Sequence, residues 1–92
     1  ACAALLAAGL DGIERKLALE PEMKGDMYGA EGVREIPKTL GAAAAALKGS
    51  AMLRAAFGDG VVEHYAHAAE WELHEQNRVV TDWERSRGFD RA

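Results

Sequence analysis

The chain has 92 residues and a formal net charge of −4, so it is large enough for one small domain. This acidic balance, without a stripe of Lys and Arg, argues against nucleic acid and an anionic membrane surface as partners. A single cysteine, Cys2, excludes an intrachain disulfide and favours a reducing, cytoplasmic setting.

The first predicted element is a helix over residues 1–19, which we expect Pro21 to end. An apolar stripe recurs at intervals of four, three and four residues: Leu6, Leu10, Ile13 and Leu17. The apolar residues 1–10 have no basic segment before them, and Asp11 cuts them short. We therefore interpret this start as helix rather than as a signal peptide or a membrane span.

Residues 20–38 hold two prolines and three glycines without helical periodicity, so they predict a long loop. Two short helices follow, and each has a capping signal. Thr39 caps a helix over residues 40–48, which Gly49 stops. Ser50 caps a helix over residues 51–57, which Gly58 closes.

The longest predicted helix starts at Asp59 or Gly60 and runs to about Val80. Its apolar stripe consists of Val62, Tyr65, Ala66, Ala69, Leu73 and Val80. Thr81 followed by Glu84 is a capping box, so a further helix should begin at Asp82 and end at Gly88. No segment alternates as a strand would. The sequence predicts a mainly α fold of four to five helices with a long Gly/Pro-containing loop, in one segment over residues 1–92.

Large aromatic residues occupy positions that this helical core does not explain. Trp71 lies on the side of its helix opposite Leu73, and Trp83 and Phe89 belong to the terminal helix. Alanine supplies 19 of the apolar residues, so the core is thin. We interpret these three aromatics as an interface with another surface. The alternative is that each Trp is partly exposed and rests on an Arg or His neighbour.

The long helix carries three histidines near Glu63 and Glu70, a combination that could indicate a metal site: His64, His67 and His74. Carboxylate-bridged bundles space Glu and His by three residues, whereas here the spacing is four, and no second helix offers matching ligands. We therefore expect no metal ligand in this chain. We also find no nucleophile–base pair and no phosphate-binding motif, so no catalytic residue and no cofactor-binding residue is assigned.

Four stretches, in order, resemble the C-terminal end of the type I glutamine synthetase family. They are residues 3–17, the loop Gly25-Asp26-Met27-Tyr28, residues 34–40 with the Ala-rich helix and Phe57-Gly58 after them, and the ending over residues 70–72 and 80–89. The ending is similar to the γ-glutamyl-amine-ligase-like branch. The resemblance covers nearly the whole chain, and the order of the four stretches makes it fairly specific.

The resemblance implies an ATP-dependent ligase, in which glutamate is activated as γ-glutamyl phosphate and ammonia or an amine displaces the phosphate. The parent fold is an α+β catalytic domain in two stacked hexameric rings that uses Mg²⁺ or Mn²⁺. The family's metal ligands, ATP contacts and glutamate-binding arginines match no residue here. Tyr28 matches a tyrosine that some bacterial members adenylylate, and residues 82–92 match a strap that reaches the opposite ring.

These implications predict a C-terminal structural and oligomerisation segment of such a ligase. Its partners would be the remainder of the ligase chain or other copies of itself, in a cytoplasmic homo-oligomer. Two alternatives stay open. One is a stand-alone helical protein–protein interaction module without catalysis, and the other is a small metal-binding bundle.

Overall fold

A computed structural model describes residues 1–91 of the chain. Its elements, in order, are α1 (Cys2–Glu14), the short 3₁₀ helix η1 (Met27–Gly29), α2 (Leu40–Lys48), α3 (Ala51–Phe57), α4 (Asp59–Asn77) and α5 (Asp82–Phe89). The described residues contain no strand. The prediction of a mainly α fold with up to five α-helices and a long loop is confirmed.

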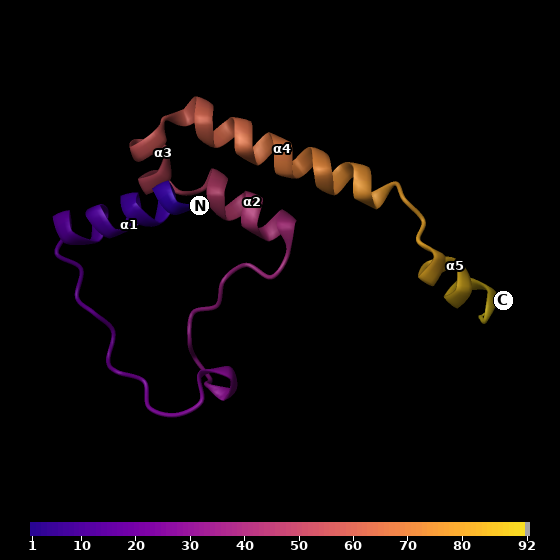
Figure 1. The fold of residues 1–92 in the computed structure, drawn as a ribbon, viewed down its shortest axis with the longest axis horizontal. Coiled ribbons are helices and arrows are strands. Elements are labelled where there is room, and N and C mark those ends of the chain that lie inside the picture. Colours follow the sequence, from indigo (N-terminus) through magenta and orange to yellow (C-terminus); the bar gives the residue numbers. More distant parts are fainter. Residues whose placement is uncertain (92) are drawn as a thin grey trace.

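The helices form a loose cluster rather than a closed bundle (Figure 1). α2 and α4 lie side by side and run in opposite directions, α3 joins them, and α1 lies beside α3. The loop before α2 extends away from the cluster, and α5 lies beyond the far end of α4 (Figure 1). The radius of gyration is 18.7 Å, whereas a compact domain of this length has about 12 Å.

The core lies between α2 and α4, where Ala44, Val62 and Ala66 are the buried apolar residues of the described chain. Small residues let the two helices approach closely. At Gly41, a β-carbon would lie only 3.2 Å from the Leu73 side chain. This packing is tight but small, because two of the three buried residues are alanines.

The two short helices have the predicted bounds and the predicted caps. The Thr39 hydroxyl accepts a hydrogen bond from the Ala42 N–H at 3.2 Å, and the Ser50 hydroxyl accepts one from the Leu53 N–H at 3.2 Å. Each satisfies a backbone donor that the first helical turn leaves free. Gly58, at φ +83°, separates α3 from α4 in a conformation that favours glycine.

The predicted end of the first helix near residue 19 is wrong, because α1 stops at Glu14. Lys16 adopts a left-handed backbone with φ +51°. Its N–H donates to the Ile13 carbonyl at 3.1 Å, and the Leu17 N–H donates to the Gly12 carbonyl at 3.0 Å. These two bonds form a Schellman motif, which ends the helix before Pro21 is reached.

The end of the longest helix also differs from the prediction. α4 ends at Asn77 rather than near Val80, and Val80 is exposed in the segment that leads to α5. Thr81 must be extended to cap α5, with φ −77° and ψ +156°, so the chain leaves the helical conformation before it. α5 continues one residue beyond Gly88, to Phe89. Tyr65 is 65% exposed and does not join the core.

Within residues 1–91, no helix combines the length and the apolar character that crossing a bilayer requires.

Candidate functional site

The apolar stripe of the first helix is not covered by the rest of the described chain. The four residues of the stripe and the adjacent Leu5 are each between 56% and 76% exposed. The stripe consists of Leu6, Leu10, Ile13 and Leu17. The stripe was predicted as the core-facing side of a helix, and the helix exists, but within residues 1–91 no core faces it. Such a contiguous aliphatic surface is typical of a contact surface.

A groove of about 490 Å³ separates α1 from α3. Leu10 lines it from α1, and Met52 and Phe57 line it from α3, with Asp11 and Glu14 at one side. Asp11 forms an ion pair with Arg15 at 2.8 Å, which compensates part of this acidic charge. The groove is therefore mainly apolar and continues the exposed surface of α1.

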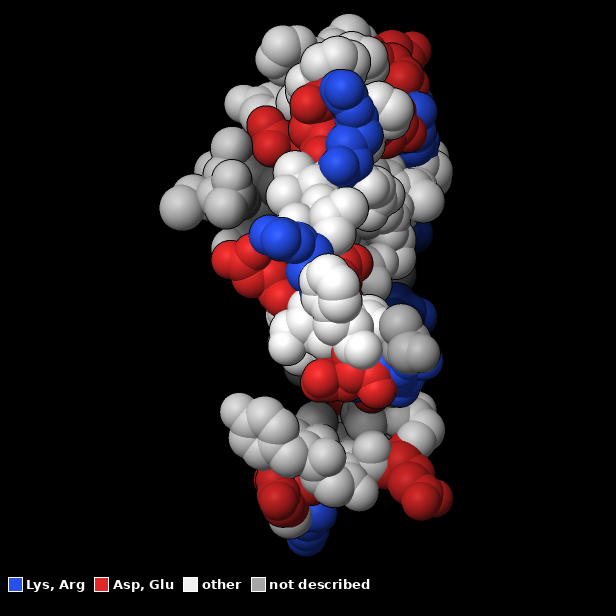
Figure 2. Space-filling view, turned by 90° about the vertical axis from the view of Figure 1, so that its right-hand side faces the viewer, with Lys and Arg blue, Asp and Glu red and all other residues white. Residues whose placement is uncertain are grey.

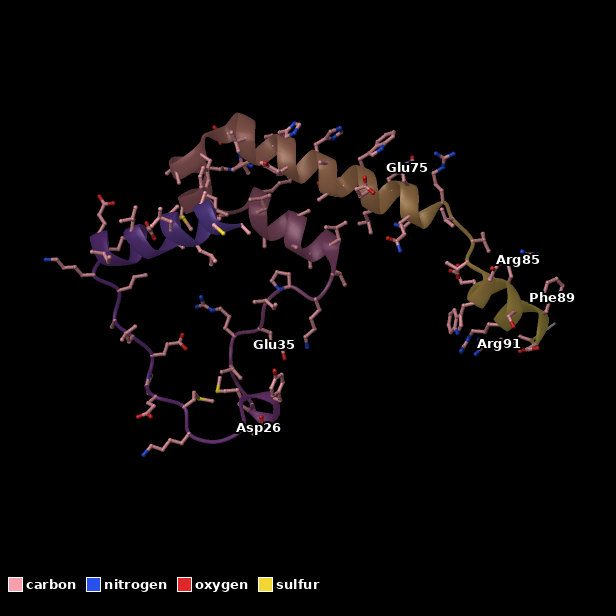
Figure 3. The ribbon with its side chains drawn as sticks, in the orientation of Figure 1. Asp26, Glu35, Glu75, Arg85, Phe89 and Arg91 are labelled. Carbon is pink, nitrogen blue, oxygen red and sulfur yellow. The ribbon has the colours of Figure 1, made fainter. Side chains whose placement is uncertain are left out.

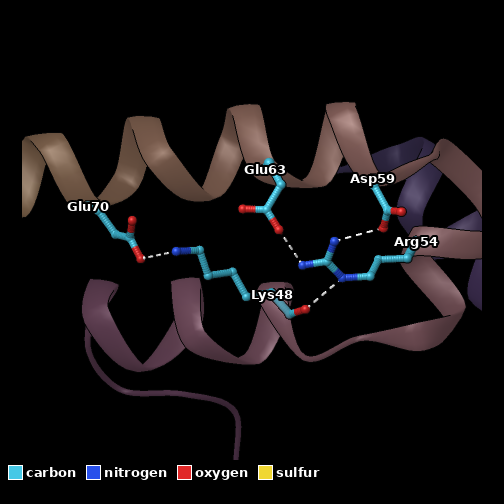
Figure 4. A network of polar contacts seen from close by, with 5 residues as sticks. All are labelled: Lys48, Arg54, Asp59, Glu63 and Glu70. Atoms are coloured by element: carbon cyan, nitrogen blue, oxygen red, sulfur yellow. Dashed lines mark hydrogen bonds and ion pairs between the residues drawn. The ribbon is translucent and has the colours of Figure 1, made fainter.

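An ion-pair network holds α2, α3 and α4 together (Figure 4). The Arg54 guanidinium on α3 donates to the Lys48 backbone carbonyl at 2.8 Å, to Asp59 at 2.8 Å and to Glu63 at 2.5 Å. Lys48 in turn donates to Glu70 at 2.7 Å. Every member of this network has a protein partner, so we assign it the role of orienting the three helices rather than of binding a ligand.

The charges in this network support one another. Hydrogen bonds to Asp59 and then Glu63 raise the pKa of Arg54. The hydrogen bond to Glu70 raises the pKa of Lys48. Both side chains therefore stay cationic. Sequence reasoning missed the network, and the only signal that could have found it is that Asp59 and Glu63 lie one turn apart at the start of α4.

The three aromatic residues predicted to form an interface are all exposed. Trp71 is 57% exposed, Trp83 is 66% exposed and Phe89 is 78% exposed. Each Trp also has the kind of neighbour that the alternative interpretation required. The Trp71 and His74 rings lie 6.0 Å apart, and the Arg87 guanidinium lies 5.1 Å from the Trp83 ring centre. With these neighbours, both Trp71 and Trp83 remain more than half exposed.

The terminal helix begins with a complete capping box. The Thr81 N–H donates to the Glu84 carboxylate at 2.8 Å, and the Glu84 N–H donates to the Thr81 hydroxyl at 3.2 Å. The Thr81 backbone N–H, and then its hydroxyl, lower the pKa of the Glu84 carboxyl. The box orients α5 and carries Phe89 at the far end of that helix, away from the helical cluster (Figure 3).

Tyr28 lies in η1 within the long loop and is fully exposed. The Asp26 carboxylate accepts a hydrogen bond from the Tyr28 N–H at 2.9 Å, which fixes the short turn. Figure 3 shows Asp26 at the tip of the loop, remote from the helices. The structure therefore does not bring Tyr28 together with Trp71, Trp83 or Phe89.

The described residues contain no candidate for a metal site. In residues 1–91, no three His, Cys, Asp or Glu side chains converge where they could hold a metal ion. Acidic and basic side chains are interspersed over the face seen in Figure 2. What the chain does present is uncovered apolar and aromatic surface, so its candidate site is a set of interaction surfaces.

Comparison with known proteins identifies the family. The profile of the family described as "Glutamine synthetase, catalytic domain" matches residues 1–88. The chain belongs to the glutamine synthetase family. This membership confirms the resemblance that the four sequence stretches indicated.

Individual relatives refine the comparison. The chain is 45% identical over 91 residues to the gamma-glutamylethanolamide synthetase of Streptomyces coelicolor, covering 99% of this chain and 20% of that protein. It is 38% identical to the glutamate–isopropylamine ligase of a Pseudomonas species (96% and 20% covered) and 35% identical to the glutamine synthetase of Thermus thermophilus (95% and 21% covered). The chain thus spans about a fifth of the length of these relatives.

Proposed function

We propose that this chain is the C-terminal structural and oligomerisation segment of a glutamine synthetase-like ATP-dependent ligase. In the parent enzyme, glutamate and ammonia or an amine would be joined to a γ-glutamyl amide. Family membership and the one-fifth coverage of the relatives support this proposal.

The observation that carries the proposal is the uncovered surface of the chain. Residues 1–91 contain three buried apolar side chains, and the accessible surface is 8340 Å². A compact protein of 9.9 kDa exposes about 5,200 Å². The excess on this chain alone, roughly 3,100 Å², is above the range of about 1,000–2,500 Å² that each partner of an obligate interface buries. A compact protein of this mass would not expose so much surface, so we infer that other protein surface covers part of this chain.

Two kinds of uncovered surface suggest two partners. The exposed face of α1 is aliphatic, as domain cores are, so we assign it to the remainder of the ligase chain. Trp71, Trp83 and Phe89 are aromatic, and Arg87 accompanies Trp83, a composition enriched in contacts between subunits. We assign these residues to other copies in a cytoplasmic homo-oligomer.

ATP and Mg²⁺ or Mn²⁺ would belong to the parent enzyme and not to this segment. Titration of the chain with ATP and Mg²⁺ in a calorimeter should give no saturable heat. Micromolar affinity would contradict this part of the proposal, because it would require a phosphate site that the sequence does not contain.

Tyr28 would serve as the modification site of this segment, because it matches the tyrosine that some bacterial members of the family adenylylate and is fully exposed on the loop. Mass spectrometry of the chain after incubation with an adenylyltransferase and ATP should show an adenylyl adduct on Tyr28. The Tyr28→Phe variant is the control, and equal labelling of that variant would exclude the assignment.

A segment exchange tests the structural role. The matching 91 residues of the Streptomyces relative are replaced by this chain, and the assembly size and ligase activity of the chimera are measured. The proposal predicts an assembled, active chimera. Leu10→Asp in the chimera should abolish assembly, whereas Ala8→Asp, on the other side of α1, should be tolerated better. A chimera that cannot assemble, beside a compact and monomeric isolated chain, would instead indicate a stand-alone helical interaction module.

A further inference from the structure

One side of α4 carries a regularly spaced row of four residues, of which three are exposed and the last is half-buried. His64, Ala68, Trp71 and Glu75 follow one another at intervals of four, three and four residues. At about 100° per residue they lie within roughly 60° of one another. Val62 and Ala66 lie on the opposite side, against α2. We call these four residues the outer row, and Figure 3 shows Glu75 on the side of α4 away from α2.

The alternation of four and three residues is the spacing by which two helices pack along a common seam. We propose that the outer row is the contact between α4 of one chain and α4 of a second copy, with the two helices antiparallel and related by a two-fold axis between Ala68 and Trp71. This inference rests on the proposed function, because it names the surface and the partner of the subunit contact.

The outer row is complementary to itself in this arrangement. A two-fold axis makes every contact reciprocal. Ala68 then lies opposite Trp71 of the second copy, so a small residue receives a large one, twice. His64 lies opposite Glu75 of the second copy, and its ring N–H can donate to that carboxylate. The reciprocal pair repeats both contacts.

A parallel arrangement would lose this complementarity. It would place Glu75 opposite Glu75, Trp71 opposite Trp71 and His64 opposite His64, so like charges would meet. Glu75 already accepts a hydrogen bond at 3.1 Å from Arg78, the residue that follows α4 in the same chain. A carboxylate has about four acceptor sites, so this bond leaves capacity for the imidazole of the second copy.

The histidines on one flank of the outer row are compatible with the contact. His67 and His74 flank the outer row on one side and would meet His74 and His67 of the second copy. A neutral imidazole is both a donor and an acceptor, so these rings can pair. The ion pair between Lys48 and Glu70 lies on the α2 side and stays outside the contact. Trp71 supplies the largest uncovered side chain of the row and is the expected hot spot.

Site-directed cross-linking tests the direction of the pair. Two variants of the chain are made in a Cys2→Ser background, one with His64→Cys and the other with Glu75→Cys. In the antiparallel pair, positions 64 and 75 of different chains are adjacent, while two copies of position 64 are about 16 Å apart along the axis. A short bis-maleimide should therefore cross-link the mixture and neither variant alone. Cross-linking within either single variant, or none in the mixture, would overturn the proposal.

A pair of aromatic variants tests the energetic role of the row. Sedimentation of the chain should show that Trp71→Ala weakens self-association at least tenfold, whereas Tyr28→Ala, at an exposed position of the long loop, changes it less than threefold. Circular dichroism should show equal helix content in both. An unchanged dissociation constant for Trp71→Ala, or a chain that does not self-associate at all, would refute the outer-row contact.

The two proposals fail separately. If the chimera with the Streptomyces relative assembles and is active while the cross-link is absent, the outer-row contact is wrong and the structural role stands. If the chimera neither assembles nor works while the cross-link forms, the ligase role is wrong and the chain is a self-associating helical module.

Discussion

Glu84 couples its own charge to the start of a helix. Its carboxylate accepts hydrogen bonds from the Thr81 N–H and from the Thr81 hydroxyl, both at 2.8 Å. A protonated carboxyl accepts these bonds less well, so the bonds lower the pKa of Glu84 below its ordinary value of 4.5. The folded helix therefore favours the charged form.

The sign of the resulting pH dependence follows from linkage. A carboxyl whose pKa is lowered in the folded state contributes stability above its unfolded value, and loses it as the pH falls through the folded value. We expect amide exchange in residues 82–91 to accelerate as the pH falls below about 4.5, after correction for intrinsic rates. Glu84→Gln keeps an acceptor for the box and should remove this dependence. If the Glu84→Gln variant and the unchanged protein showed the same acceleration of amide exchange at low pH, another titrating group would be responsible.

Lys16 is a second residue whose backbone sets local structure. It holds the left-handed position of the Schellman motif at φ +51°, where glycine is the usual residue. A side chain in this region costs about 1 kcal/mol. Lys16→Gly should therefore stabilise the end of α1 by up to about 1 kcal/mol, reduced by the greater freedom of glycine in the unfolded chain. Urea unfolding measures this, with Lys24→Gly in the loop as control. A loss of stability would mean that the lysine side chain contributes contacts of its own.

Among the elements, α5 depends most on its own cap, because its contacts with the other helices are few. Its exposed Trp83 and Phe89 do not anchor it to the rest of the described chain. The Thr81/Glu84 box satisfies backbone donors that the first turn of the helix leaves free. The direction of α5, and hence the position of Phe89, is therefore set at Thr81.

Removing this cap should release the terminal helix first. Thr81→Ala should cost about 1 kcal/mol of local stability, and Thr81→Ser should retain the box. Hydrogen exchange on residues 82–91, together with the oligomer size of the chimera, checks both expectations. If Thr81→Ala changes neither, the terminal helix is held by packing in the assembly, and its cap is dispensable.

Helix starts could be predicted from the sequence, and helix ends less well. Thr39, Ser50 and Thr81 mark their helices because a hydroxyl acceptor is a local signal. The end of α1 depends on a lysine in a left-handed conformation, for which the residue type gives no warning. The Arg54 network likewise joins three helices, and its partners become neighbours only after folding. Of the outer row, the sequence indicated only Trp71, because this residue lies on the side of its helix opposite the predicted apolar stripe.

At the scale of the whole molecule, the apolar residues fall into two groups that burial separates. Val62 is 2% exposed between α2 and α4, while Leu10 is 59% exposed on α1. Periodicity alone predicts both as core-facing, because it reveals that a helix has an apolar side and not what covers that side. The proposed function adds that the remainder of the ligase covers Leu10.

The two groups should therefore respond differently to truncation. Val62→Ala should cost about 2 kcal/mol in the isolated chain and in the chimera, because the cavity forms within the segment in both. Leu10→Ala should change the isolated chain by less than about 0.5 kcal/mol, because the side chain is exposed there. In the chimera it should cost about 2–5 kcal/mol, since the same leucine would be buried against the ligase.

Denaturant unfolding of both variants in both contexts measures these four values. The decisive quantity is the difference between the two contexts for Leu10→Ala, with Val62→Ala as the internal reference. If Leu10→Ala lowers the free energy of unfolding equally little in the isolated chain and in the chimera, the aliphatic face of α1 remains uncovered in the assembled enzyme. The uncovered surface of the chain would then have to be explained by contacts elsewhere, at the outer row of α4 or at the exposed aromatic residues of α5.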